Sequence, residues 1–546
     1  MKLPAYTAIV TAMLSASVLL TACSDNDDDT ITAAPMVVEP TPKTISLAKI
    51  GRFETNLFDK GAAEITAYDA ASKRLFIVNA ADAVIDVIDL KDPTKPTKIG
   101  MINASGLGAG INSVAVRDGI VAAAVEATIK QDNGLVVFYK ASDLSKISQV
   151  AVGALPDMLT FSPDGKTVLV ANEGEPNAAY TVDPEGSISV INVTDISKPT
   201  AKIADFKAFN GQEVNLRSKG IRIYGLNASA AQDFEPEYIT VSSDNKTAWV
   251  ALQENNAIAV VDLATAKITA VHPLGYKDHG KAGQGIDASD RDNAINIKPW
   301  ANVLGMYQPD AIASYQVDGQ TYLVAANEGD SRNYDGFSEE SRVKDLLLDP
   351  TVFTDAACGG VCRGDALLGR LNVTNTLGFT QNAEGQKIYN KLYVLGGRSF
   401  SIHKTDGGLV FDSGDQLEQL VAKRQPNFFN SDHAANALDN RSDNKGPEPE
   451  GLALGKIGSK TFAFIGLERD SGVVVYDISK PTAPTFVDYI NTRDFTRDTK
   501  TPAAGDLGPE GVAFVSAKDS PNGKPLLVVG YEVSGSTVVF QINQTF

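Results

Sequence analysis

Carboxylate side chains occur at two fixed positions of a unit that repeats along this sequence. In the clearest copy, residues 154–176, Asp157 follows a proline and opens one apolar run, and Glu173 follows the next apolar run. Acids at the first position are Glu64, Asp157, Glu237, Asp310, Glu448, Glu450 and Glu510. Acids at the second position are Glu173, Glu254, Glu328, Asp330, Glu468 and Glu532. Because equivalent positions of a closed repeat meet at one end, we expect these carboxylates to converge.

Converging carboxylates raise one another's pKa unless a cation lies between them. A hard cation with oxygen ligands fits such a site, with Ca²⁺ as the first expectation and Mg²⁺ as the second. The predicted metal ligands are Glu173, Glu237, Asp310, Glu328, Asp330, Glu450, Glu468 and Glu510. The alternative is that each acid accepts hydrogen bonds from the backbone amides of its own loop.

A second candidate chemistry is phosphoester hydrolysis. Arg332, in the acid-rich segment 327–335, and Arg398 carry guanidinium groups suited to gripping a phosphate beside a metal. Ser399 is a candidate nucleophile, although no base is paired with it in the sequence. The four histidines lack metal-ligand spacing, which argues against a dizinc site of the alkaline phosphatase type. The sequence contains no P-loop, G-x-S-x-G or dinucleotide-binding motif.

The repeat also predicts the fold. Seven copies each bring two or three short apolar runs, separated by turn residues such as Ser162-Pro163-Asp164-Gly165. We therefore predict an all-β, seven-bladed β-propeller over residues 45–546, with six or eight blades as alternatives. Residues 44–53 precede the first unit and would supply the fourth strand that the last unit lacks, which would close the ring.

The fifth unit is interrupted by an insertion, residues 333–389, that we expect to be partly helical. Apolar residues at Val343, Leu346 and Leu347 predict a short helix there. The same insertion contains Cys358 and Cys362, which indicate a small disulfide in an oxidising compartment. A redox-active or metal-binding pair is the alternative. A long insertion in a compact repeat usually acts on something or covers something.

The N-terminus predicts export and lipid attachment. Residues 1–22 have a short basic region and an apolar stretch too short to span a bilayer. They end in Leu20-Thr21-Ala22 before Cys23, which looks like the lipobox of bacterial lipoproteins, with an ordinary signal peptide as the alternative. Ser24 favours the outer membrane. The acidic and then Pro/Thr-rich residues 23–44 read as a tether between the lipid and the body.

Charge restricts the partners. The 546-residue chain has a formal net charge of −18, from 67 acidic and 49 basic residues. Nucleic acid is not an expected partner, because its phosphates require a basic protein face. The balance suits a soluble exported protein or one that concentrates cations.

Several phrases of the sequence resemble the choice-of-anchor I domain family. They are residues 324–346, 396–415, 442–454, 464–481, 506–514 and 527–540. The resemblance implies a propeller at the cell surface, here anchored by the lipid on Cys23. The family is related to mesenchyme-specific cell-surface glycoproteins linked to biomineralisation, and its members are often labelled alkaline-phosphatase-like.

Two functional hypotheses follow. The preferred one is a surface-anchored binding propeller that holds Ca²⁺ in its acidic mouth and engages an extracellular ligand. The other is a metal-dependent phosphoesterase in which Arg332 and Arg398 stabilise the phosphoryl charge. The paired arginines favour the second hypothesis, and the missing nucleophile–base pair favours the first.

Overall fold

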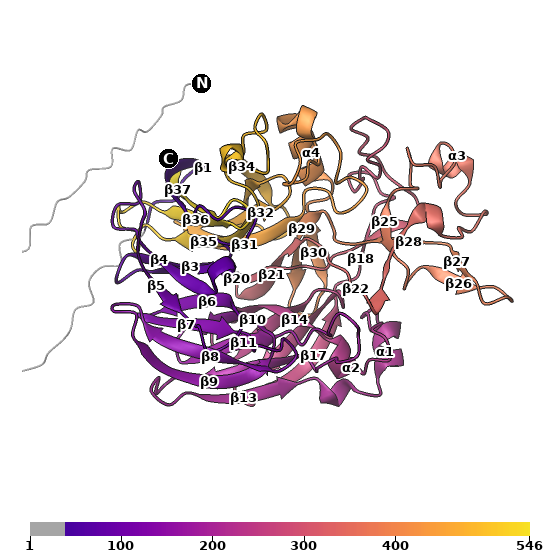
Figure 1. The fold of residues 1–546 in the computed structure, drawn as a ribbon. Coiled ribbons are helices and arrows are strands. Elements are labelled where there is room, and N and C mark those ends of the chain that lie inside the picture. Colours follow the sequence, from indigo (N-terminus) through magenta and orange to yellow (C-terminus); the bar gives the residue numbers. More distant parts are fainter. Residues whose placement is uncertain (1–38) are drawn as a thin grey trace, which may run out of the picture. The chain divides into compact units, whose positions relative to one another are not determined.

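The computed structural model describes residues 39–546 (Figure 1). The predicted signal peptide, the lipid site at Cys23 and all but the end of the predicted tether lie outside the described residues. The body begins slightly before the predicted boundary at residue 45. The Thr41 hydroxyl donates a hydrogen bond of 3.0 Å to Ser459, and the Lys43 amide donates one of 2.7 Å to the Thr545 carbonyl.

Seven four-stranded antiparallel sheets make up most of residues 39–546. The first four are β2 (Thr66–Asp69), β3 (Arg74–Asn79), β4 (Val84–Asp89) and β5 (Thr97–Asn103); β6 (Ile111–Arg117), β7 (Ile120–Val125), β8 (Asn133–Lys140) and β9 (Lys146–Ala154); β10 (Pro156–Phe161), β11 (Thr167–Asn172), β12 (Ser187–Asn192) and β13 (Thr200–Asp205); and β14 (Pro236–Val241), β15 (Thr247–Leu252), β16 (Ala257–Asp262) and β17 (Lys267–Pro273). The other three are β20 (Ile312–Val317), β21 (Gln320–Asn327), β29 (Ser399–Lys404) and β30 (Leu409–Asp412); β31 (Pro449–Ile457), β32 (Lys460–Leu467), β33 (Gly472–Asp477) and β34 (Thr485–Asn491); and β35 (Pro509–Val515), β36 (Leu526–Tyr531), β37 (Ser536–Thr545) and β1 (Thr44–Glu54).

The first strands of these sheets form a closed ring. In chain order β2, β6, β10, β14, β20, β31 and β35 each contact the next, and β35 contacts β2. Figure 1 shows the result at the junction, where the C-terminal strands lie beside the first strands of the body. A ring of antiparallel sheets with their first strands innermost is a β-propeller. The predicted all-β propeller fold is confirmed.

Burial explains why the second strands read as continuous apolar runs. In β11, Val168, Leu169, Val170 and Ala171 are all fully buried, since a sheet in the ring is covered on both faces by its neighbours. The fourth strand β13 is mostly exposed by contrast, and half of its residues are polar. Sequence periodicity therefore marks each strand's distance from the propeller axis.

The chain termini close the last sheet. β1 pairs antiparallel with β37, from Thr44 opposite Thr545 to Glu54 opposite Ser536. The buried carboxylate of Asp506 fastens β1 to the neighbouring loop, through Lys49 at 2.6 Å and Arg52 at 2.6 Å. This pairing covers the edge of β37 and confirms the predicted fourth strand.

Two long excursions leave the ring near its fifth sheet. The first, between β17 and β20, contains β18 (Tyr276–Asp278) and β19 (Val303–Met306). The second, between β21 and β29, contains β22 (Asn333–Tyr334), β23 (Phe337–Ser338), β24 (Glu340–Arg342), β25 (Asn372–Thr374), β26 (Phe379–Gln381), β27 (Lys387–Tyr389) and β28 (Leu392–Val394). β19 pairs in parallel with β28, so the two excursions share one small sheet.

The helix predicted at Val343, Leu346 and Leu347 is wrong. A single 3-10 turn, η3 (Val343–Asp345), follows β24 instead. Val343 and Leu346 pack in the core of the excursions, whereas Leu347 is 45% exposed. Two of the three apolar side chains thus pack in the tertiary core from a short 3-10 turn, without an α-helix. The insertion's helix is the four-residue α3 (Asp355–Cys358), and its last residue, Cys358, forms a disulfide with Cys362, with Cα atoms 5.3 Å apart.

The remaining helical elements are short. They are η1 (Ala80–Asp82), η2 (Lys207–Phe209), α1 (Glu213–Ser218), α2 (Ala230–Asp233), α4 (Gln416–Arg424), η4 (Pro426–Phe428) and η5 (Pro502–Ala504). Within residues 39–546, no helix has the length and apolar character needed to cross a membrane.

Candidate functional site

The start of four inner strands aims a carboxylate toward the propeller axis. β10, β14, β31 and β35 each begin with proline followed by an acid, and in each the pairing register shifts within the first four residues. The shift is a β-bulge, which inserts an extra residue and re-aims the side chain there. The acids concerned are Asp157, Glu237, Glu450 and Glu510.

Glycine after the acid lets neighbouring inner strands approach closely. A Cβ atom at Gly451 would lie 2.0 Å from the Glu510 carbonyl oxygen, and one at Gly511 would lie 2.2 Å from the Glu64 carbonyl oxygen. No side chain fits in these gaps. The Pro-Glu-Gly phrases therefore draw Glu450, Glu510 and Glu64 together around the axis.

Asp157, Glu237, Glu450 and Glu510 line one polar cavity of about 560 Å³ at the end of the ring. Its lining contains eleven carboxylates and three cationic side chains among the described residues. The carboxylates are Asp59, Asp157, Glu173, Glu237, Asp310, Glu328, Asp330, Glu450, Glu468, Glu510 and Glu532. We call this space the acidic cavity. All eight predicted metal ligands lie in its lining, so the structure brings the predicted set together.

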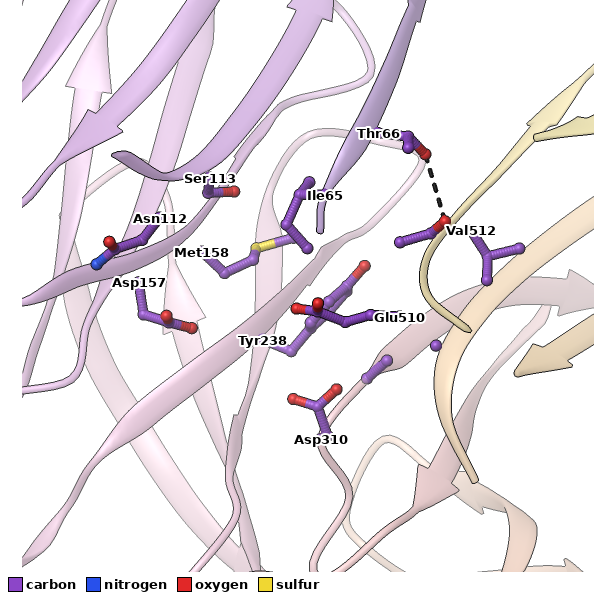
Figure 2. A pocket seen from close by; sticks show the side chains of 13 residues that line it. Ile65, Thr66, Asn112, Ser113, Asp157, Met158, Tyr238, Asp310, Glu510 and Val512 are labelled. Carbon is purple, nitrogen blue, oxygen red and sulfur yellow. Dashed lines mark hydrogen bonds between the residues drawn. The ribbon is translucent and has the colours of Figure 1, made fainter. Parts of the chain in front are cut away.

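A smaller cavity of about 100 Å³ continues from the acidic cavity along the inner strands. Asp157, Asp310 and Glu510 line both spaces. Figure 2 shows these three carboxylates pointing toward one another, with Tyr238 beside them. The three acids come from β10, the loop before β20, and β35, so widely separated repeats share this point.

Several acids lie close enough to hold one ion. Single oxygens of Glu64, Glu510 and Glu532 lie within 4.8 Å of one another, as do those of Glu328, Glu448 and Glu468. His433, Glu468 and Glu532 form a third such group. The space between the ligand atoms of each group has the size that a divalent cation occupies between its ligands.

Three buried oxygens on the cavity wall have no hydrogen-bond partner in residues 39–546. They are the Oε2 atoms of Glu237, Glu450 and Glu510. A fourth unpaired oxygen, Oε2 of Glu254, is buried outside the lining. Capping of the local loop amides, the alternative considered from the sequence, would have paired these oxygens. A buried acceptor without a donor calls for another partner.

Burial and mutual repulsion shift the acids in and around the cavity toward the protonated form. Burial, reinforced by Glu532, raises the pKa of Glu64 to about 8, and burial raises the pKa of Asp157 and of Asp330 to about 6. Burial and neighbouring carboxylates raise the pKa well above its usual range for Glu173, Glu237, Glu254, Asp310, Glu450, Glu468 and Glu510. A bound cation would oppose these shifts.

One sector of the wall carries its own counter-charges. Lys445 Nζ lies 2.6 Å from Glu328 Oε1 and 3.0 Å from Glu448 Oε2. Arg469 Nη1 lies 3.0 Å from Glu468 Oε1, and its Nε lies 3.2 Å from Glu448. Although burial opposes its ionisation, these cations and Arg441 lower the pKa of Glu448. Negative charge without a protein counter-ion is therefore concentrated on the remaining sectors.

Arg332 does not line the acidic cavity. Its side chain is 1% exposed and pairs with Asp233, and its Nη2 lies 3.0 Å from Glu235 Oε2. The guanidinium also lies over the Tyr224 ring at 4.6 Å from the ring centre. Through these contacts the guanidinium group of Arg332 holds the start of the insertion against the loop before β14.

Arg398 and Ser399 also lie away from the cavity lining. Arg398 Nη1 donates to Glu418 Oε1 at 2.7 Å, and Nη2 donates to the Ser442 carbonyl at 2.7 Å. The Ser399 hydroxyl is fully buried and donates to Asp412 at 3.2 Å. The three catalytic candidates are therefore engaged in internal contacts.

A serine–histidine contact is present that the sequence did not indicate. Ser401 Oγ and His403 Nε2 are 2.8 Å apart on β29, and the His403 Nδ1 lies 3.0 Å from the Gly407 carbonyl. Both side chains are at most 1% exposed. Burial lowers the pKa of His403 to about 4, which keeps the ring neutral in the sheet interior. We assign this pair to the packing of the sheet.

Several residues of the cavity wall were not predicted from the sequence. Among them are His433, Lys445 and Arg469. The first two come from the polar stretch 427–446, which has no counterpart in the other repeats, so the repeat pattern could not place them. Arg469 follows a predicted acid, Glu468, and was available from the sequence as the next residue after the strand.

The fold and cavity define the class as a β-propeller with a carboxylate-lined axial mouth. Residues 64–481 match the choice-of-anchor I domain family, and the chain belongs to that family. The family is associated with the cell surface, which indicates an extracellular or surface protein.

Two curated relatives match part of the chain. One is the mesenchyme-specific cell surface glycoprotein of Strongylocentrotus purpuratus, 30% identical over 281 residues that cover 46% of this chain and 35% of that protein. The other is gigasin-3a of Magallana gigas, 31% identical over 191 residues that cover 33% of this chain and 66% of that protein. The match thus spans about a third of the first relative's length.

Two solved structures have similar chain traces. Hydrazine synthase of Kuenenia stuttgartiensis matches with a TM-score of 0.46 and 14% identity, over 88% of this chain and 96% of that one. The Cps50 (Swd1) β-propeller domain of Myceliophteria thermophila matches with a TM-score of 0.42 and 8% identity, over 89% and 98%.

Proposed function

We propose that this protein is a cell-surface binding propeller that holds a divalent cation, Ca²⁺ first and Mg²⁺ second, in the acidic cavity. The observation that carries the proposal is the set of unpaired buried oxygens of Glu237, Glu450 and Glu510 on a wall with eleven carboxylates. Carboxylate oxygens at this density suit a hard cation. Of these three acids, Glu510 belongs to a group that could hold one ion, together with Glu64 and Glu532.

The proposed cation would also create the binding surface for an extracellular ligand. The acidic cavity opens at the end of the ring, so an ion held by wall carboxylates keeps some coordination positions directed away from the wall. A ligand with anionic oxygens, such as a carboxylated or sulfated matrix polymer, would complete the coordination. The acidic wall would repel the same ligand when the ion is absent, which makes binding conditional on the cation.

Anchoring completes the proposal. We propose that a lipid on Cys23 attaches the chain to the cell envelope, at the outer membrane, with the acidic segment that follows as a spacer. Mass spectrometry of the N-terminal peptide from the membrane fraction tests this part. A thioether-linked diacylglyceryl group on Cys23 supports it, and an unmodified thiol on a processed chain overturns it.

Phosphoester hydrolysis is the alternative function for the same cavity. The placement of Arg332 and Arg398 in internal ion pairs gives it less support than the sequence did. Of the three cationic groups on the wall, Lys445 and Arg469 already pair with acids there, and the third is Lys60 at the exposed rim. We therefore favour binding over catalysis.

Thermal unfolding with and without the cation tests the proposed function. Ca²⁺ should raise the melting temperature of the chain relative to EDTA, because an ion that binds only the folded state stabilises it by mass action. In the double variant Glu237→Gln/Glu510→Gln this increase should fall at least by half. Glu384→Gln, an exposed acid of the insertion, is the matched control and should keep the full increase.

The same samples decide between the two functions. No hydrolysis of a phosphomonoester or phosphodiester in Ca²⁺ or Mg²⁺, together with a Ca²⁺-dependent melting temperature, supports the binding function. Metal-dependent turnover that the double variant abolishes would overturn it in favour of the phosphoesterase. An identical melting temperature in EDTA and millimolar Ca²⁺ would overturn the cation.

A further inference from the structure

A second group of aspartates meets outside the acidic cavity. Asp287 and Asp292 lie in the excursion between β18 and β19, and Asp439 lies in the segment between η4 and β31. One carboxylate oxygen of each lies within 4.8 Å of the others. None of the three lines the acidic cavity. Two segments more than a hundred residues apart thus present acids to one point.

Asp439 carries an oxygen that has no protein partner. Its side chain is 2% exposed, and its Oδ1 accepts a hydrogen bond from the Ser442 hydroxyl. Its Oδ2 is buried and has no hydrogen-bond donor in residues 39–546. The carboxylate belongs to the group that meets Asp287 and Asp292, so its neighbours add repulsion instead of compensating its charge. A buried carboxylate oxygen in that position calls for a cation.

No basic side chain of the described residues forms an ion pair with this group. The nearby Asp290 pairs with Arg370 at 2.9 Å, and Arg398 pairs with Glu418 at 2.7 Å. Arg398 instead donates to the backbone carbonyls of Asp287 and Ser442, both at 2.7 Å. It holds the two segments together without neutralising their aspartates.

We propose that Asp287, Asp292 and Asp439 bind one Ca²⁺ ion that links the two segments. The donor set is oxygen only, with no cysteine or histidine, which favours Ca²⁺ over zinc and other transition metals. Asn430 shares a hydrogen-bond partner with Asp439: its amide donates to Ser442 Oγ at 2.8 Å, and its own Oδ1 is buried without a partner in residues 39–546. An amide oxygen is a neutral donor of the type that Ca²⁺ accepts.

The raised pKa values of Asp439 and Asp287 agree with this assignment. Burial, followed by the nearby Asp287, raises the pKa of Asp439 to about 9. Burial also raises the pKa of Asp287 to about 7, although the amides of Asn296 and Ser289 donate to it. A cation between the carboxylates would remove the repulsion.

The proposed ion would order one wall of the acidic cavity. The segment that carries Asp439 also carries His433 and Lys445, which line that cavity. Asp439 lies between them in sequence. Fixing this segment to the excursion that bears Asp287 would therefore hold Lys445 at its position beside Glu328. The two sites are separate, and this inference does not rest on the proposed function of the acidic cavity.

Hydrogen exchange of the full chain, followed by mass spectrometry in Ca²⁺ and in EDTA, tests the proposal. Peptides from residues 283–299 and 430–446 should both exchange about tenfold more slowly when free Ca²⁺ is ten times its dissociation constant. Asp439→Asn should remove this protection from both segments together. The same variant should melt at an equal or higher temperature than the wild type in EDTA, because it removes repulsion while keeping the shape.

Two variants separate this site from other causes. Asp292→Asn, at a partly exposed position, should also remove the protection, and it remains informative if Asp439→Asn fails to fold. Asp278→Asn, at a half-buried position at the end of β18, is the matched control and should keep it. Glu237→Gln/Glu510→Gln should keep it as well. Equal exchange of both segments in Ca²⁺ and EDTA, or full protection in Asp439→Asn, would overturn the proposal.

Discussion

At the scale of single residues, the acidic cavity combines unpaired carboxylates with a small set of internal counter-ions. Lys445 is the most buried of these counter-ions, at 8% exposure, and contacts Glu328, Glu448 and the Gly329 carbonyl. Burial disfavours its charge, but Glu328 and Glu448 outweigh this and hold its pKa well above its usual range. Its charge is therefore fixed, and it sets the net charge that a cation meets.

Replacing Lys445 should lower the stability of the fold and raise its affinity for Ca²⁺. Lys445→Met leaves two acids without their partner, and breaking a buried pair in this way costs about 3–5 kcal/mol of unfolding free energy. The same change makes the wall more negative, so the affinity for Ca²⁺ should rise. Urea unfolding measures the first effect and calorimetric titration the second. Lys60→Met, at the exposed rim, should change stability by less than about 0.5 kcal/mol. A Ca²⁺ affinity that falls in Lys445→Met would contradict this account.

At the scale of elements, the bulged starts of the inner strands and the closure by β1 give the ring its geometry. The bulges aim the acids, and closure keeps the seven first strands at fixed distances from the axis. Asp506 joins these features, because its buried carboxylate holds β1 through Lys49 and Arg52 while it accepts from Ser536 on β37. Although burial acts against it, Lys49 and Arg52 lower the pKa of Asp506.

Loss of the Asp506 charge should loosen the closure. Asp506→Asn keeps the size of the side chain but leaves Lys49 and Arg52 without their partner, and we expect a loss of about 2–4 kcal/mol in unfolding free energy. Chemical denaturation measures it. The matched control Asp118→Asn, at an 80% exposed side chain, should change it by less than about 0.5 kcal/mol. Equal stabilities of the two variants would show that β1 is held by strand pairing alone.

The insertion shows where element-level prediction reached its limit. The disulfide between Cys358 and Cys362 was expected from the lone cysteine pair and is present. The helix expected at Val343 is absent, because Val343 and Leu346 already pack from a turn into the core around Trp300 and Leu371. Outside a repeat, apolar spacing alone could not distinguish a helix from a turn packed against a distant segment.

At the scale of the whole molecule, the repeat made the fold predictable. Because each copy of the repeat has the same order of strands, β1 could be assigned to the last sheet and the acids to one end of the ring. Convergence of Glu237, Asp310 and Glu510 on one cavity followed from that symmetry. What symmetry could not supply were contacts made by unique segments, such as Lys445 at the cavity or Asp439 beside Asp287. Long-range pairing of non-repeated loops leaves no periodic signal in a single sequence.

The raised pKa values of the acids predict how the stability of the metal-free protein depends on pH. In the unfolded chain carboxylates release their protons near pH 4, but the pKa of folded Asp157 and Asp330 is about 6 and that of Glu64 is about 8. The folded state therefore binds more protons between about pH 4 and pH 8. Stability in EDTA should fall as pH rises through this window. For each group, every tenfold difference in acid strength between the folded and unfolded states contributes about 1.4 kcal/mol at most.

Urea unfolding in EDTA at pH 5 and pH 8 measures this dependence. Ca²⁺ should reduce the loss at pH 8, since it takes the place of the protons. Glu64→Gln should reduce the loss without Ca²⁺, because an amide does not titrate. Stability that stays level or rises between pH 5 and pH 8 in EDTA would contradict the assignment of raised pKa values to the acidic cavity.

The most direct test of the central claim is a crystal structure of the protein grown in Ca²⁺, with anomalous difference density recorded. We expect a peak in the acidic cavity, with carboxylate oxygens from at least two sheets about 2.3–2.6 Å from it. The peak should be absent in crystals grown in EDTA and weakened in Glu237→Gln/Glu510→Gln. An acidic cavity without anomalous density at saturating Ca²⁺ would contradict the claim that this propeller holds a divalent cation there.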